Sequence, residues 1–334
     1  MNKRDRVKNA ILHRSTDIVP YNIELTSEEM EKVAKFVGIN KSDFWDWSGN
    51  HIEKISYNIG GSYISPDHFR DEFGVIWDRS IDKDIGIVEA VKFIEPDINT
   101  YVFPEPDIEE IKRSTEKFLS NGRDSFKFGK IGLAYYERAW SLRGMENLLM
   151  DFLLEPEFVD ELLEKILAYN MKIIDAALEY DLDGFYFGDD YGQQTGLIMS
   201  PETWRRFIKP GMAKMFGKIK KAGKVVALHS CGDIGDLFGD LIEIGLDVYQ
   251  TFQPEIYDIK KVKEEFGSSL SFYGGISTQK TLPFVSPDKL KLIVKETLNI
   301  MSVNGGYIAA PTHQVPKDVP PENIVALVEV LKAQ

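Results

Sequence analysis

The pattern of hydrophobic and polar positions changes at about residue 125. Beyond that point short apolar runs alternate with longer amphipathic segments, which is the pattern of βα units that feed a parallel sheet. The segment 156–179 carries apolar residues at helical spacing, and Ser200 followed by Pro201 is a typical helix start. The predicted strands are Phe128–Leu133, Gly184–Phe187, Val225–His229, Asp247–Gln250, Leu270–Tyr273 and Tyr307–Ala310.

The first 120 residues are less regular. We expect a helix at 3–12 and a strand at Val19–Glu24, and we assign no individual elements between 30 and 120. Six βα-like units and an N-terminal strand favour an α/β fold, a distorted (β/α)8 barrel of the TIM type, over a doubly wound open sheet. No Gly-x-Gly-x-x-Gly motif follows a predicted strand, which disfavours a dinucleotide-binding sheet. Without a linker or an internal repeat, residues 1–334 are expected to form one barrel domain.

Composition narrows the class of protein. Hydrophobic residues make up 43% of the 334 positions, enough for a sizeable core, and the formal net charge is −13. Binding to nucleic acid through phosphates needs lysine and arginine, so such an acidic chain is a poor candidate for it. No apolar run is long enough for a membrane span or a secretory signal, so we expect a cytoplasmic protein without a membrane partner. The single cysteine excludes an intramolecular disulfide and a four-cysteine zinc module.

Candidate metal ligands lie where predicted strands end, which is where parallel barrels carry their functional sites. His229 and Cys231 are two residues apart, so both side chains leave the same face of an extended backbone. An imidazole beside a thiolate is a two-point site for a soft divalent metal, with zinc favoured, although a buried structural cysteine beside a hydrogen-bonded histidine has the same spacing. His313 ends the last strand and can face the same barrel mouth, or it can hydrogen-bond a loop.

Other polar residues at strand ends are further candidates. Asp189 and Asp190 are adjacent, so only one of them can point inward from an extended chain. Glu137 is either an acid of the site or half of a surface pair with Arg138. The residues expected to act in catalysis are Asp189, Glu137 and His313, and those expected to contact a substrate are Tyr135, Tyr186, Asp190, Gln193 and Gln279.

At these residues the chain resembles the uroporphyrinogen decarboxylase superfamily. Its branches include the decarboxylase itself and a large set of zinc- and corrinoid-dependent methyltransferases. The resemblance covers nearly the whole length, is strongest from about residue 134 onward, and implies a distorted (β/α)8 barrel. The stretches that carry it are Asp71–Gly74, Glu137–Trp140, Gly188–Asp190, His229–Gly232, Gly274–Ile276, and Pro311–His313 followed by Pro320–Asn323.

Two features separate the branches of this superfamily. In the decarboxylases the first strand runs into an arginine-rich loop that binds the many carboxylates of the tetrapyrrole. The corresponding stretch here, 19–26, contains Glu24 and no basic residue, and a Phe-Ser-Asp segment of the decarboxylases has no clear equivalent. His229-x-Cys231 instead matches the zinc ligands of the methyltransferases. His313 stands where many methyltransferases carry a second cysteine, and it agrees there with the decarboxylases.

The resemblance therefore implies a zinc-dependent methyltransferase that moves a methyl group between a small-molecule substrate and a corrinoid. A separate corrinoid protein would carry the cofactor, because this chain has no recognisable cobalamin-binding segment. Zinc would be held by His229, Cys231 and His313, or by the first two with a carboxylate such as Asp189 or Glu137.

Two other functions stay open. One is uroporphyrinogen decarboxylase or a related decarboxylase, in which His313 and an aspartate such as Asp189 would act without a metal. The other is a barrel without catalytic activity that only binds a ligand or a corrinoid protein. A homodimer is an open alternative for the assembly.

Overall fold

A seven-stranded parallel sheet forms the centre of the computed structural model, which describes residues 1–81, 83 and 86–334. The strand order is β1-β6-β7-β10-β11-β12-β13, and each neighbouring pair is parallel. The strands are β1 (Ile52–Ser56), β6 (Phe126–Ile131), β7 (Gly184–Gly188), β10 (Val225–His229), β11 (Val248–Phe252), β12 (Ser271–Ile276) and β13 (Tyr307–Pro311).

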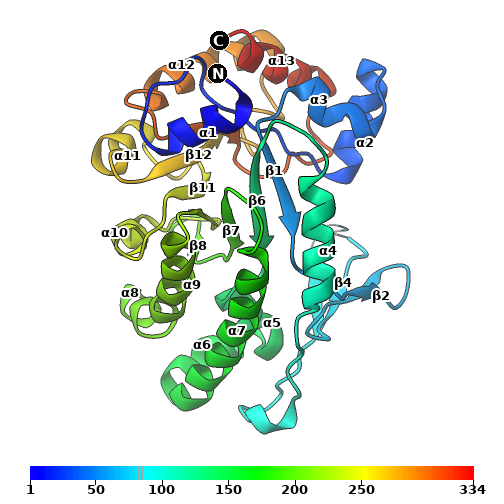
Figure 1. Ribbon diagram of the computed structural model, residues 1–334, viewed down its shortest axis with the longest axis vertical. Helices are drawn as coiled ribbons and strands as arrows, with labels where there is room; N and C mark the ends of the chain where they lie inside the picture. Colours follow the sequence, from blue (N-terminus) through cyan, green and yellow to red (C-terminus); the bar gives the residue numbers. More distant parts are fainter. Residues whose placement is uncertain (82, 84–85) are drawn as a thin grey trace.

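An extended N-terminal segment closes this curled sheet. Tyr21 forms a parallel bridge with Ala309 of β13, and the backbone N–H of His51, just before β1, donates to the carbonyl of Tyr21 at 3.1 Å. The strand predicted at Val19–Glu24 is thus found as an extended segment that pairs only through isolated bridges, in the eighth position of the barrel. The predicted distorted (β/α)8 barrel is confirmed (Figure 1).

The predicted strands after residue 125 are all present, with small differences at their ends. The largest is at β12, which runs on to Ile276 although Gly274 and Gly275 read as the start of a turn. A Cβ on Gly274 would lie 2.9 Å from the backbone nitrogen of Phe252 in β11. These glycines are therefore explained by the close approach of a neighbouring strand.

Helices cover the outside of the sheet (Figure 1). The predicted helices are found with nearly the expected bounds, and Ser200 caps its helix by accepting a hydrogen bond from the Thr203 N–H at 3.2 Å. The helices are α1 (Lys3–Ile11), α2 (Ser27–Val37), α3 (Phe44–Ser48), α4 (Ile108–Leu119), α5 (Tyr136–Arg143), α6 (Met145–Leu154), α7 (Pro156–Ala177), α8 (Pro201–Thr203), α9 (Lys209–Lys221), α10 (Phe238–Glu243), α11 (Ile259–Phe266), α12 (Pro287–Met301) and α13 (Pro321–Lys332). No helix within the described ranges is both long enough and apolar enough to cross a bilayer.

The irregular region after β1 contains a small antiparallel sheet in place of a simple βα unit. Its strands are β2 (Ser62–Tyr63), β3 (His68–Arg70), β4 (Ile76–Asp78) and β5 (Ile87–Ala90), and α4 follows it. A two-stranded hairpin, β8 (Gly192–Gln193) and β9 (Gly196–Leu197), follows β7. Neither the insertion nor the hairpin has a strong periodic pattern, because strands of two to four residues are too short to produce one.

The two ends of the barrel differ. Val7 and Ile11 of α1 pack with inward-facing residues such as Phe126 and Ile308, and so fill the end at which the strands begin. Figure 1 shows α1 at this end and α5 and α6 at the opposite end. The opposite end of the barrel, at which the strands finish, is the end where barrels of this type carry their functional sites.

Candidate functional site

A cavity of about 530 Å³ lies at the ends at which the barrel strands finish. That volume suits a small organic molecule. The small antiparallel sheet contributes one wall, and the strands and the first turn of α5 contribute the rest. Its charged and histidine lining residues are Glu24, Lys54, Asp71, Glu72, Arg79, Lys130, Glu137, Arg138, Asp190, His229 and His313, and its aromatic ones are Phe69, Trp77, Tyr186 and Tyr273.

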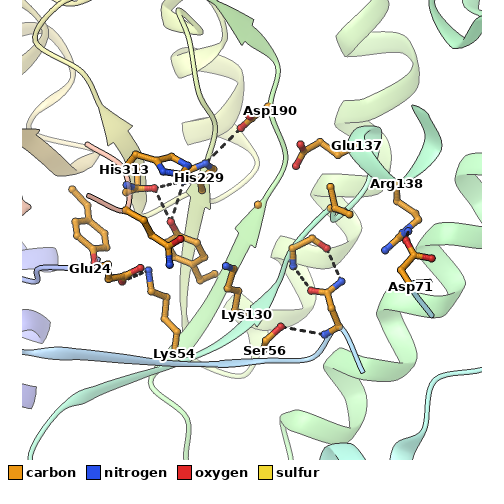
Figure 2. Close-up of a pocket in the computed structure, with 18 of the residues that line it drawn as sticks. Glu24, Lys54, Ser56, Asp71, Lys130, Glu137, Arg138, Asp190, His229 and His313 are labelled. Atoms are coloured by element: carbon orange, nitrogen blue, oxygen red, sulfur yellow. Dashed lines mark hydrogen bonds and ion pairs between the residues drawn. The ribbon is translucent and has the colours of Figure 1, made fainter. Parts of the chain in front are cut away.

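Three side chains of metal-binding types come together beside the cavity: His229 and His313, which line it (Figure 2), and Cys231. The donor atoms of His229, Cys231 and His313 all lie within 4.8 Å of one another. His229 Nε2 and Cys231 Sγ are 3.6 Å apart. Two ligands of one tetrahedral zinc, at about 2.0 Å for nitrogen and about 2.3 Å for sulfur, would be separated by roughly 3.6 Å. The structure thus unites residues that are 82 positions apart in the chain, and their spacing suits one metal ion.

The loop after β10 is held in place by its neighbours. The backbone N–H of Cys231 donates to Asp190 Oδ1 at 2.8 Å, and the N–H of Ser230 donates to the Gln250 carbonyl at 2.7 Å. Gly232 has a φ of 80°, and a Cβ there would lie 2.2 Å from the Gly192 carbonyl carbon, so only glycine fits. This close packing fixes the direction in which the cysteine side chain leaves the backbone.

His229 is oriented by a hydrogen-bond chain behind it. Its Nδ1 contacts Gln250 Oε1, which also accepts a hydrogen bond from the Tyr186 hydroxyl at 2.6 Å. Gln250 Nε2 donates to the Thr312 carbonyl at 3.0 Å, so the amide oxygen is the atom that faces the imidazole. This network assigns the hydrogen to Nδ1 and leaves the Nε2 lone pair directed toward Cys231.

Burial shifts the pKa values of the His229 imidazole and the Cys231 thiol in opposite directions. Burial lowers the pKa of His229 to about 4, which keeps the imidazole neutral at pH 7, as a metal ligand must be. Burial, together with the adjacent Asp190 carboxylate, raises the pKa of the Cys231 thiol above its ordinary value. A thiolate at this position therefore needs a cation beside it, and a divalent metal would supply that charge.

Asp189 is fully buried and does not line the cavity. Its carboxylate accepts hydrogen bonds from the backbone N–H groups of Tyr135 (3.3 Å), Tyr136 (3.0 Å) and Glu137 (2.7 Å), and from the Tyr191 hydroxyl (2.6 Å). Burial raises its pKa to about 6, whereas these four donors favour the charged form, so the carboxylate is mainly ionised at pH 7. The side chain holds the first turn of α5 and takes no place among the donor atoms of the cluster.

Glu137, in that first turn, points into the cavity toward Asp190 (Figure 2). Burial first, and then the charges of Asp190 and Asp189, raise the pKa of Glu137 well above its ordinary value. These surroundings favour the protonated form of the side chain, which can donate a proton. Like Asp189, it lies outside the His–Cys–His cluster.

Glu137 and Arg138 are not a surface pair. The Arg138 side chain is only 2% exposed and turns to the small antiparallel sheet, where it pairs with Asp71 at 2.5 Å and with Glu72 at 2.9 Å. Asp71 also accepts hydrogen bonds from two backbone N–H groups and from the Trp77 indole. This buried network links the small antiparallel sheet (β2–β5) to α5 and so shapes the cavity wall beside Glu137.

Two lysines on neighbouring strands enter the cavity. Lys54 pairs with Glu24 at 2.5 Å and lies over the Tyr186 ring, 4.2 Å from its centroid. Lys130 on β6 also lines the cavity. Sequence reasoning singled out neither lysine, nor Gln250. The available signal for Lys130 was weak, because β6 contains a second lysine, Lys127, which does not line the cavity.

The remaining predicted substrate contacts divide into two groups. Tyr186 and Asp190 line the cavity. The Tyr135 hydroxyl instead packs against Gly211 of α9, where a Cβ would lie 2.2 Å from it. Gln193 and Gln279 are exposed and do not line the cavity. The structure therefore does not bring Tyr135, Gln193 and Gln279 to the predicted site.

The chain is similar to known proteins in both structure and sequence. A methyltransferase from Methanosarcina mazei superposes with a TM-score of 0.73 at 19% identity, over 100% of this chain and 99% of that chain. A uroporphyrinogen decarboxylase from Geotalea daltonii is 23% identical over 174 residues, which are 52% of this chain and 48% of that protein. The match thus spans about half the length of this curated relative. The sequence model of the uroporphyrinogen decarboxylase (URO-D) family matches residues 129–334, more than half of the chain, and the chain therefore belongs to that family.

Proposed function

We propose that this protein is a zinc-dependent methyltransferase that moves a methyl group between a small-molecule substrate and a corrinoid carried by a separate protein. The observation that carries the proposal is the group formed by His229, Cys231 and His313, whose donor atoms lie within 4.8 Å of one another. Two imidazoles and a thiolate are ligands that zinc favours. Three protein ligands would leave one position for substrate, which distinguishes catalytic from structural zinc sites.

Bound by these residues, zinc would supply Lewis acidity, which lowers the pKa of a thiol or stabilises negative charge on a leaving oxygen or nitrogen. The other roles belong to the chain itself. Gln250 holds the His229 ring so that Nε2 is free to bind a metal, and Asp190 fixes the backbone of Cys231. Glu137 is an acid inside the cavity whose raised pKa favours the protonated form, so its proton would be available to the heteroatom that loses the methyl group.

The charges of the cavity favour methyl transfer over uroporphyrinogen decarboxylation. A tetrapyrrole with many carboxylates needs many free cations, because unpaired buried charges are costly. Two cations that line this cavity, Lys54 and Arg138, already pair with carboxylates of the chain. The segment around Glu24 adds an acid where the decarboxylases carry arginines.

Metal analysis tests the zinc site directly. Protein purified without chelator should contain about one zinc per chain, and Cys231→Ala and His229→Ala should lose most of it. His68→Ala is the matched control, because His68 lies on β3 and pairs with Glu89 instead of the cluster. Equal and negligible zinc in all four proteins would overturn the proposed metal site.

A spectroscopic assay tests the reaction. With cob(I)alamin as a surrogate for the corrinoid protein, a methoxylated or N-methylated donor should yield methylcobalamin, which is followed by absorbance. Glu137→Gln should slow this transfer and leave the zinc content unchanged. Coproporphyrinogen formed from uroporphyrinogen at more than about 1 per minute, against typical enzyme rates of ~10 per second, would favour the decarboxylase instead.

A further inference from the structure

The ammonium group of Lys130 faces the cavity without a partner. Lys130 is the next-to-last residue of β6, and its side chain extends into the space between Glu137 and Lys54 (Figure 2). In the part of the chain that the structure describes, the Lys130 side chain makes no hydrogen bond and no ion pair. It is therefore a cationic group that can receive a negatively charged partner from outside the chain.

The other charges around Lys130 are already engaged. Glu24 forms its direct ion pair with Lys54, at 2.5 Å, and acts on Lys130 only at longer range. Arg138 is paired with Asp71 and Glu72 at the far wall. In the remaining nearby acid, Glu137, burial and the acidic neighbours raise the pKa and so favour the uncharged form.

A half-buried ammonium without a direct counter-charge is energetically unfavourable. Burial, and then the charge of Lys54, lower the pKa of Lys130, and the charge of Glu24, with that of Glu137 when it is ionised, opposes this shift only in part. An anionic ligand would supply the missing partner and form a charge-assisted hydrogen bond with the Lys130 ammonium. Lys130 should therefore bind an anionic group more tightly than a neutral group of the same shape.

The strand register separates the backbone of Lys130 from the backbone of the candidate metal ligands. Lys130 of β6 aligns with Tyr186 of β7, which aligns in turn with Ala227 of β10, two residues before His229. Neighbouring strands are about 4.8 Å apart, so the backbones of β6 and β10 are separated by roughly 10 Å. The Tyr186 ring lies in the wall between them.

We infer that Lys130 binds a single negatively charged group of the substrate, so that the substrate is a small monoanionic acid with its methyl-bearing atom at the opposite end. The anion lies at β6, and the methyl-bearing oxygen or nitrogen faces the cluster at β10 and β13. The aromatic lining residues contact the body of the molecule between the two ends. This inference names the substrate class and rests on the proposed methyltransferase function for the role of the second end.

Equilibrium binding of a matched pair of probes tests the inference. 4-Methoxybenzoate and 4-methoxybenzamide have nearly the same shape, with the methoxy group opposite the acid or the neutral amide. Isothermal titration of the zinc-loaded protein at pH 7 should give a Kd at least about tenfold lower for the benzoate, the effect of one charge-assisted hydrogen bond. Lys130→Met should abolish this preference, and Lys130→Arg should keep most of it.

Lys291→Met is the matched control, because Lys291 pairs with Glu329 on the surface and should not affect the preference. Equal affinity of wild type for both probes, no binding of either probe, or a preference that survives in Lys130→Met would each overturn the inference. Zinc content is measured on the same samples. Zinc present with no preference for the anion would reject the anion site alone, whereas a preference for the anion without zinc would reject the proposed metal site and retain Lys130 as an anion-binding residue.

Discussion

Replacement of Gln250 by leucine should weaken zinc binding although it removes no metal ligand. Gln250 Oε1 accepts from His229 Nδ1 and from the Tyr186 hydroxyl, and its amide donates to the Thr312 carbonyl at 3.0 Å. Leucine has a similar size but makes none of these contacts, so the imidazole can rotate and lose its favoured tautomer. Loss of such a supporting partner typically costs about 10- to 100-fold in metal affinity, or roughly 1.4–2.7 kcal/mol.

Competition with a chromophoric chelator measures the zinc Kd of each variant. Gln250→Glu separates orientation from packing, because its carboxylate can still accept from His229 Nδ1 while it loses the bond to Thr312. We expect Gln250→Glu to bind zinc much more tightly than Gln250→Leu. Gln193→Leu, at an exposed glutamine that does not line the cavity, is the control and should match wild type. A zinc Kd for Gln250→Leu within twofold of wild type, in a folded protein, would refute the proposed role of the hydrogen-bond chain.

Variants at three other positions test the third candidate metal ligand, a buried acid and the attachment of the small antiparallel sheet to α5. His313→Cys should retain zinc after dialysis against a weak chelator, whereas His313→Ala should lose it; equal retention in both would remove His313 from the ligand set. Burial raises the pKa of Glu29 to about 7 from 4.5, so its contribution to stability is complete below pH 4.5 and is lost as pH rises through 7. Urea unfolding should therefore show Glu29→Gln gaining on wild type by at most ~1.4 kcal/mol per pH unit across that window, and a constant difference would contradict this. Arg138→Met leaves the buried Asp71 carboxylate without its cation and should lower the free energy of unfolding by about 3 kcal/mol. This value is at the low end of the usual range because three other donors still form hydrogen bonds with Asp71. A loss below about 1 kcal/mol would show that those three donors are sufficient to stabilise the carboxylate.

The sequence was sufficient for the barrel and for the main candidate metal ligands. Each barrel strand after residue 125 is buried, so its apolar run stands out between amphipathic helices. In a parallel barrel all strands finish at the same end, so residues that follow different strands are neighbours whatever their separation in the chain. His229 and His313 met for this reason, with ring centroids 5.4 Å apart.

The direction of individual side chains could not be predicted. The i, i+2 rule allowed one of Asp189 and Asp190 to face the cavity, and only the fold shows that it is Asp190. The roles of Lys130 and Gln250 depend on which neighbours are already paired, and those partners come from distant segments. The short strands of the insertion left no periodic signal, so the ion pairs of Arg138 were not predicted either.

Adjacent aspartates at the end of β7 have different effects on the same acid. Asp189 accepts a hydrogen bond from the backbone N–H of Glu137 and so fixes the start of α5, while the charges of both aspartates disfavour ionisation of the Glu137 side chain. The carboxylate that positions the acid thereby helps to keep it protonated. Because Asp190 holds the backbone of Cys231, the proposed proton donor and the candidate metal ligand are supported by adjacent residues at one strand end. A change at this strand end should therefore disturb the acid and the metal site together, even though Glu137 belongs to α5 and Cys231 to the loop after β10.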